Sequence, residues 1–421
     1  MIDRTIIPPV ALFPKLQLTD QEVVELDNGV SLHLINKGKF PLLRISLLRQ
    51  GGCFDFNQPA AVPVLSSSII EASKSKSSDT VNSLIDFWGT KITGNSSDHF
   101  TAIEALSIRK NLNDVLSLIY DFISNAEFPA HVIDINRQRL SAQCALQQYK
   151  VSYIASIRLK ELLQGRDHPL SKIIKPDDYL NVERKSVLEI YEKIRTAKTH
   201  VFLAGCLDEN IIDDAVNIFT KLEHCTAGLT EIIPYSPLPP NREHIDVPNS
   251  KQSAIAMGLP TIDRSHPDYI LLRYAIMALG GYFGSRLMTR IREERGLTYG
   301  ITSNLLGTHE GANLVISAQC DSRYIDDVIN ETIIEINRMI SDPPKGEELM
   351  RMRHTVWSQL AQQVDTPFAT LDYYSNHLKV GTPIDYLNQQ FEVLKNITPD
   401  SISNVIKKHI DVNKFSIISA G

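Results

Sequence analysis

Two side chains that can stabilise a developing negative charge lie seven positions apart in the second half of this chain. Arg292 carries a fixed cationic fork of N–H donors, and Tyr299 carries a phenolic O–H that donates without ionising at neutral pH. Aimed at a carbonyl under attack, these donors would stabilise the oxyanion that forms. The same spacing also fits an arginine in the last helical turn before Gly296, followed by an ordinary strand tyrosine.

The sequence contains no complete catalytic or metal-binding motif beside this pair. H-E-x-x-H and H-x-x-E-H are absent, as are a G-x-S-x-G elbow, a Walker loop and a dinucleotide fingerprint. The histidines are single or in isolated pairs such as His309-Glu310, which favours hydrogen-bonding roles over metal binding. We therefore predict that this chain holds no metal.

The segment around the pair resembles the C-terminal half of a known peptidase family. Residues 279–300, LGGYFGSRLMTRIREERGLTYG, are similar to the pitrilysin–insulinase zinc peptidases, the inverzincins. Gly51-Gly52, the element 165–169 and the element 266–269 also match, so the resemblance covers nearly the whole chain. It implies that Arg292 and Tyr299 are catalytic residues that reach the substrate carbonyl.

The zinc-binding half of the family's site is missing. The family has H-x-x-E-H on the helix after the Gly51-Gly52 strand, where this chain reads AVPVLSSSIIEAS. The two histidine positions fall on Val64 and Ser68, and the glutamate position falls on Ser67. Valine cannot bind a metal, and serine is a poor zinc ligand. The window for the third ligand, 141–150, contains no acid.

The resemblance implies that such a chain is one subunit of a heterodimeric zinc metallopeptidase. A zinc-bearing paralogous subunit would activate water, and this chain would bind an unfolded peptide and stabilise the oxyanion; a homodimer is the other assembly. No cofactor is expected in this chain, and zinc is expected in the partner. The peptide would add a strand to an exposed sheet edge, for which 92–97 is a candidate. The alternative is a non-catalytic scaffold or peptide-binding assembly subunit.

Composition and charge narrow the classes of partner and cellular location that this chain could have. The net charge of −6, without a basic run, argues against a nucleic-acid partner. No stretch approaches the roughly 20 apolar residues that cross a bilayer, and the apolar start is broken by Pro8, Pro9 and Pro14, unlike a signal peptide. We expect a cytoplasmic protein without a membrane partner. The five scattered cysteines predict free thiols.

The chain is long enough for two domains, and its halves end alike. Residues 187–205 and 403–421 match at a constant offset of 216, each as a helix, a turn and a buried strand. Five prolines fall within 228–248, where they disfavour regular structure. We expect an N-terminal domain at 1–225 with the degenerate zinc motif, a Pro-rich linker at 226–245, and a C-terminal domain at 246–421 with the Arg/Tyr motif.

Apolar patterns predict an α+β fold. Two strands at 30–35 and 42–49 are expected to form a hairpin, and 91–107 predicts strands around a turn. The second half repeats this plan, with a helix expected at 285–294. The resemblance implies two duplicated domains, each an antiparallel β-sheet with helices packed on one face, in the LuxS/mitochondrial-processing-peptidase-like metallohydrolase fold.

Overall fold

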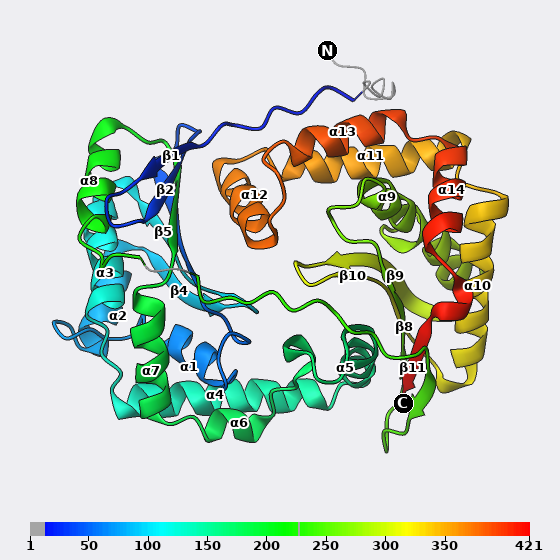
Figure 1. Cartoon of the computed structure of the whole chain (residues 1–421), viewed down its shortest axis with the longest axis horizontal. Helices are drawn as coiled ribbons and strands as arrows, with labels where there is room; N and C mark the ends of the chain where they lie inside the picture. Colours follow the sequence, from blue (N-terminus) through cyan, green and yellow to red (C-terminus); the bar gives the residue numbers. More distant parts are fainter. Residues whose placement is uncertain (1–12, 226–227) are drawn as a thin grey trace, which may run out of the picture.

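The computed structural model describes residues 13–225 and 228–421 and contains two β-sheets with helices around them (Figure 1). The N-terminal segment 1–12 and the start of the expected linker at 226–227 lie outside the described residues. The first sheet has six strands in the order β1-β2-β6-β3-β5-β4, and the second has five in the order β7-β11-β8-β10-β9. The α+β prediction is therefore confirmed.

The first sheet is mixed. Its strands are β1 (Glu22–Glu25), β2 (Ser31–Asn36), β3 (Leu42–Gln50), β4 (Lys91–Ser96), β5 (Phe100–Ile108) and β6 (Thr199–Gly205). Strand β6 lies between β2 and β3, parallel to β2 and antiparallel to β3. The predicted hairpin of 30–35 with 42–49 is therefore wrong, because a strand more than 150 residues later takes the place between them. The β4–β5 hairpin is as predicted.

The second sheet repeats this arrangement. Its strands are β7 (Arg242–Ile245), β8 (Ser253–Thr261), β9 (Thr298–Gly307), β10 (Ala312–Cys320) and β11 (Ser416–Ala420). Strand β11 pairs parallel with β7 and antiparallel with β8, as β6 does with β2 and β3. The expectation of purely antiparallel sheets is thus wrong in both halves, because the last strand of each half runs parallel to one of its neighbours, β6 to β2 and β11 to β7.

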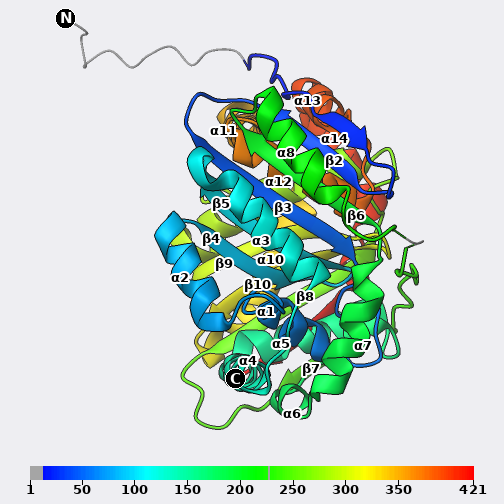
Figure 2. The same cartoon turned by 90° about the vertical axis from the view of Figure 1, so that its left-hand side faces the viewer.

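Helices cover the outer face of each sheet (Figures 1 and 2). Over the first sheet lie α2 (Ser78–Trp88), α3 (Leu112–Ser124) and α8 (Glu209–Phe219), whose apolar side chains share one core with the strands. Beside them pack α1 (Ala61–Ser68), α4 (Ala130–Gln148), α6 (Pro176–Leu180) and α7 (Arg184–Arg195). The second sheet's core includes α9 (Tyr269–Gly280), α10 (Ile325–Ser341), α11 (Gly346–Gln362), α13 (Tyr386–Asn396) and α14 (Pro399–His409).

Two helices cross from one half to the other and so depart from the prediction of helices on one face. Helix α5 (Val151–Gln164) packs on β8 and β11 of the second sheet, and α12 (Pro367–Val380) packs on β6 and β2 of the first. The offset of 216 that relates the two chain ends also carries Val151 to Pro367 and Gln164 to Val380. Equivalent helices are thus exchanged, and both lie in the space between the sheets (Figure 1).

The proline-rich connection is extended but shorter than predicted. No helix or strand occurs over 228–241, whereas Arg242–Ile245 forms β7. These four residues lie between Pro240 and Pro248 and keep their N–H groups, so they can pair with β11.

Within the described residues, no helix has the length and apolar character to cross a membrane. All five cysteines are free.

Candidate functional site

Arg292 lies in a π-helical segment, Met288–Glu294, where the sequence predicts an ordinary helix. The segment closes on Arg295, whose N–H bonds the Arg290 carbonyl five residues back, and Gly296 then takes a left-handed φ of 62°. The stop at Gly296 is as expected, because glycine adopts this conformation at little cost. π-Turns of this kind widen a helix and are frequent at functional sites.

Arg292 differs from the arginines around it. Three neighbours are paired with glutamates: Arg286 with Glu348 at 2.6 Å, and Arg290 and Arg295 with Glu331 at 2.9 and 2.6 Å. Arg292 has no carboxylate within 4 Å among the described residues, and its guanidinium carbon lies 4.8 Å from the centre of the Phe283 ring. The ring contacts the cation, and the N–H donors of Arg292 have no hydrogen-bond partner in the described part of the chain.

Tyr299 projects from a β-bulge at the start of β9. Thr298 pairs with Cys320 and Ile301 pairs with Ala318, so two residues of β9 lie opposite Gln319 alone. The Thr298 hydroxyl fixes the bulge, since it lies 2.5 Å from the Gln319 carbonyl oxygen and accepts the Gly300 N–H at 3.1 Å. Bulges redirect side chains, and Tyr299 is 88% exposed.

Tyr299 borders an open pocket on the inner face of the second sheet. The pocket has a volume of about 460 Å³ and is lined by β8, β9 and β10 together with Ser152 at the start of α5. Its floor carries small or polar side chains, among them Ala254, Thr302, Ser317 and Gln319. Strand β9 is an edge strand of the second sheet, and β4 is an edge strand of the first. The predicted peptide-binding edge, 92–97, lies at β4. Helix α1 packs against β4.

The degenerate zinc positions lie on α1. Val64 is fully buried in an apolar cluster, and Ser68 is fully buried beside it. Asn136 of α4 donates to the Ser68 hydroxyl at 3.1 Å, and Arg139 of α4 donates to the Ser67 hydroxyl at 3.0 Å. The hydroxyls are therefore committed to hydrogen bonds, and a guanidinium lies beside them. This donor set does not fit zinc, because an apolar side chain and a neighbouring cation both oppose a metal ion.

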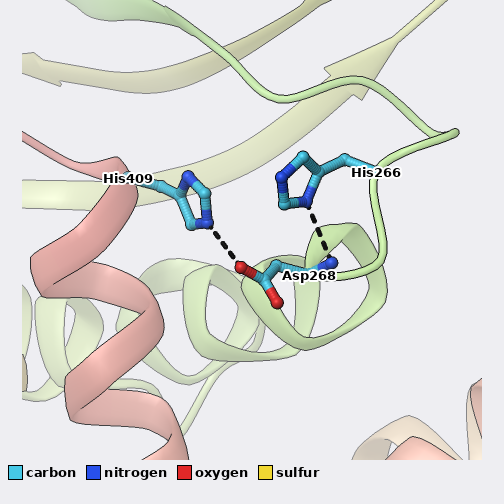
Figure 3. Close-up of side chains that lie close together, drawn as sticks. All are labelled: His266, Asp268 and His409. Carbon is cyan, nitrogen blue, oxygen red and sulfur yellow. Dashed lines mark hydrogen bonds and ion pairs between the residues drawn. The ribbon is translucent and has the colours of Figure 1, made fainter.

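A second polar cluster, which sequence reasoning missed, joins α9 to α14 (Figure 3). His266, Asp268 and His409 have potential ligand atoms within 4.8 Å of one another. The Asp268 N–H donates to His266 Nδ1 at 3.0 Å, and His409 Nε2 donates to Asp268 Oδ2 at 2.8 Å. His266-Pro267-Asp268 is visible in the sequence, but nothing local points to His409.

The same cluster is better explained as a salt bridge than as a metal centre. Lys408 donates to Asp268 Oδ2 at 2.7 Å, and the hydrogen bonds from Lys408 and His409 lower the pKa of Asp268 to about 2. The carboxylate therefore already has a cation. The lone pair of His266 Nδ1 is used by a backbone N–H, so a metal would have to displace both contacts. The cluster of His266, Asp268, Lys408 and His409 therefore connects the start of α9 to the end of α14.

Comparison with known proteins places this geometry in a family. Residues 181–356 match the family model described as Peptidase M16 inactive domain. The chain is 21% identical over 271 residues to "Probable inactive metalloprotease YmfF" of Bacillus subtilis, covering 63% of this chain and 62% of that protein. It is 20% identical to "Non-peptidase homolog YmxG" of Helicobacter pylori over 96% of this chain and 94% of that protein.

Solved structures confirm the fold. The crystal structure of a peptidase M16 inactive domain from Pseudomonas fluorescens superposes with a TM-score of 0.86 at 20% identity, covering 96% of this chain and 98% of that one. The predicted fold is thereby confirmed, and the match of residues 181–356 bears out the predicted resemblance to the family.

Proposed function

Because the chain is a homologue of the M16 peptidases, of the inactive kind that lacks the zinc ligands, we propose that it is the oxyanion-stabilising and substrate-binding subunit of a two-chain zinc endopeptidase. The observation that carries the proposal is that Arg292 lacks a carboxylate partner. It is the one arginine of Arg286, Arg290, Arg292 and Arg295 without a carboxylate partner in the described part of the chain. A half-buried cation left unpaired among paired ones is available to a substrate.

Tyr299 supports the same role. The bulge turns it outward next to the pocket on β8, β9 and β10, seven residues after Arg292. A cationic fork and a phenolic donor from consecutive elements can both reach one carbonyl oxygen as its charge develops. The chain would add no nucleophile, because nothing at Val64, Ser67 or Ser68 can hold the metal that activates water.

The proposed partner would complete a site that this chain holds only in part. Within this chain, the inner faces of the two sheets are partly covered by α5 and α12. The peptide-binding space is proposed to lie between this chain and a zinc-bearing paralogue, in a heterodimer, with an unfolded peptide as the substrate.

The rival function is a scaffold or peptide-binding assembly subunit. It is favoured by the hydrogen bonds that fill the former zinc position and by the names of the two relatives, an inactive metalloprotease and a non-peptidase homologue. A scaffold has no use for an unpaired Arg292 and an exposed Tyr299, so these two residues separate the proposals.

A crossed reconstitution decides between them. The zinc-bearing paralogue of the same organism is mixed with the parental chain or with the Arg292→Ala, Tyr299→Phe double variant, and complex formation and peptide cleavage are both measured. We expect both mixtures to assemble and only the parental one to cleave, with chelator abolishing its activity. Arg323→Ala, Tyr149→Phe is the matched control, since Arg323, like Arg292, lies over an aromatic ring and Tyr149 is 83% exposed. Full activity with the Arg292, Tyr299 variant would leave the chain as a scaffold.

A further inference from the structure

We propose that the first half binds one halide-sized anion, chloride in the cell, against Arg49 in a small, partly enclosed cavity beneath α1. The cavity lies between β3 and β5 on one side and α1, α3 and α7 on the other. It is separate from Arg292 and Tyr299, and the inference goes beyond the proposed function. The argument rests on the contacts of Arg49, the charges around it, and the size and lining of the cavity.

Arg49 is a buried cation with few partners. It is only 5% exposed, and one guanidinium nitrogen donates to the Ile194 carbonyl at 3.3 Å. Its Nε makes no hydrogen bond within the described residues, and no carboxylate there lies within salt-bridge distance. Burial lowers the pKa of Arg49 to about 10, so the group is still positive at neutral pH. A buried charge without a counterion is strongly unfavourable.

The surrounding charges do not supply that counterion. Glu223, the carboxylate whose field acts on Arg49, is bonded to Arg195 at 2.5 Å. Arg195 in turn repels the guanidinium of Arg49. Arg195 also pairs with Glu192 at 2.9 Å, so both nearby carboxylates are held by Arg195 and neither contacts Arg49.

Two of the lining's polar groups, Arg49 and Thr101, have donors that no described residue uses. The hydroxyls of Ser66 and Tyr191 donate to the carbonyls of Val62 and Ile123 at 3.0 and 2.7 Å. Thr101 lies directly opposite Arg49 across the β3–β5 pair, and its hydroxyl has no partner among the described residues. An anion needs hydrogen-bond donors, which Arg49 and Thr101 supply, and the positive charge of Arg49 favours an anion over a neutral guest.

The cavity size restricts the anion. Its volume is about 30 Å³, and one water-sized guest occupies about 10–15 Å³ on this measure. One halide ion fits, whereas a tetrahedral oxyanion such as phosphate, with five heavy atoms, does not. The rest of the lining is mostly apolar and includes Leu47, Leu65 and Ile69. An apolar lining favours an ion that loses its hydration shell easily.

Crystals of the full chain grown or soaked in sodium bromide test the site directly. We expect one anomalous bromide peak in contact with the Arg49 guanidinium and the Thr101 hydroxyl. Density without anomalous signal, refining as water, would overturn the proposal. Because this readout uses the parental chain, it does not depend on how any variant folds.

Thermal unfolding gives a second, independent readout. At constant ionic strength, replacing gluconate by chloride should raise the Tm of the parental chain by about 2 °C. Arg49→Met keeps the length of the side chain without its charge and should lose this response. Arg323→Met, a change at an exposed arginine, should keep it. Equal chloride responses in Arg49→Met and the parental chain would contradict the proposal.

Discussion

At the scale of single residues, the second half presents two donors whose surroundings leave them unused. Arg292 is held over Phe283 instead of by a carboxylate, and Tyr299 is turned outward by a bulge. Neither side chain contributes to a buried core, so their contribution to stability is small. Changes at these positions therefore report on chemistry and not on folding.

We expect the single variants Arg292→Ala and Tyr299→Phe to lower the kcat of the reconstituted enzyme by about 10²–10³, the loss of one oxyanion donor. KM should change less, because the donors act mainly on the charge that develops during attack. Steady-state kinetics and the Tm of each variant check this. Parental kcat in both variants would mean that Arg292 and Tyr299 are only a helix-end arginine and a strand tyrosine.

The former zinc position leads to the opposite expectation, an absence of metal chemistry. The purified chain should retain no stoichiometric zinc after dialysis, because Val64 is apolar and Arg139 places a cation next to Ser67. Elemental analysis measures this directly. Restoring ligands by Val64→His with Ser68→His should give at most weak zinc binding while Arg139 remains. One tightly held zinc per parental chain would disprove the assignment.

At the scale of elements, α1 and β4 approach so closely that only glycine fits at one position. A Cβ added to Gly94 of β4 would lie 1.7 Å from the Ser66 carbonyl oxygen of α1. The strand edge and the helix that carries the former zinc positions are therefore in backbone contact. Their spacing cannot widen without moving α1 against α4 and α7.

Gly94→Ala should consequently destabilise the chain by about 3 kcal/mol, the upper range for overpacking in a well-packed site. Gly300→Ala is the matched control, because a Cβ there meets nothing within 4 Å and the residue has no left-handed φ. It should change stability by less than about 1 kcal/mol. Urea unfolding of both variants compares them, and similar free energies of unfolding would refute the close-contact argument.

At the scale of the molecule, the two halves are joined by exchanged helices and by one buried ionic contact. His99, before β5, donates to Asp55 of the first half at 2.9 Å and to Glu310 of the β9–β10 turn at 2.7 Å. Both carboxylate side chains are almost fully buried. Burial alone would lower the pKa of His99, but the two carboxylates outweigh it and raise the pKa to about 10. Burial would raise the pKa of Glu310, yet His99 helps to lower it to about 2.

This contact gives stability a defined pH dependence. The His99 contribution is complete below its unfolded pKa of about 6.5 and is lost as pH rises through about 10. The Glu310 contribution is complete above its unfolded value of about 4.5 and is lost as pH falls through about 2. Both act fully between these unfolded values. His99→Ala should cost about 3–5 kcal/mol there, since it leaves two buried carboxylates unpaired.

Calorimetry of the parental chain and His99→Ala across pH 4–10 checks this, and the difference between them should shrink toward pH 10. His131→Ala serves as the control, because His131 is exposed. A difference that stays constant with pH would mean that His99 acts by packing and not by charge.

The sequence alone determined the features that depend on local pattern. These features are the missing zinc ligands at Val64, Ser67 and Ser68, the stop at Gly296, the β4–β5 hairpin and the repeat at an offset of 216. Each of them is recognised from a short stretch of sequence. Such features follow from side-chain type and period, which a short window contains.

Only the tertiary structure decided which distant residues meet. Strand β6 enters between β2 and β3, α5 and α12 change places, and His409 reaches Asp268 from 141 positions away. The pairing of Glu331 with Arg290 and Arg295, which leaves Arg292 unpaired, depends on the packing of α10 in the same way. These contacts are selected by burial and charge balance over the folded chain, and no local window carries that information.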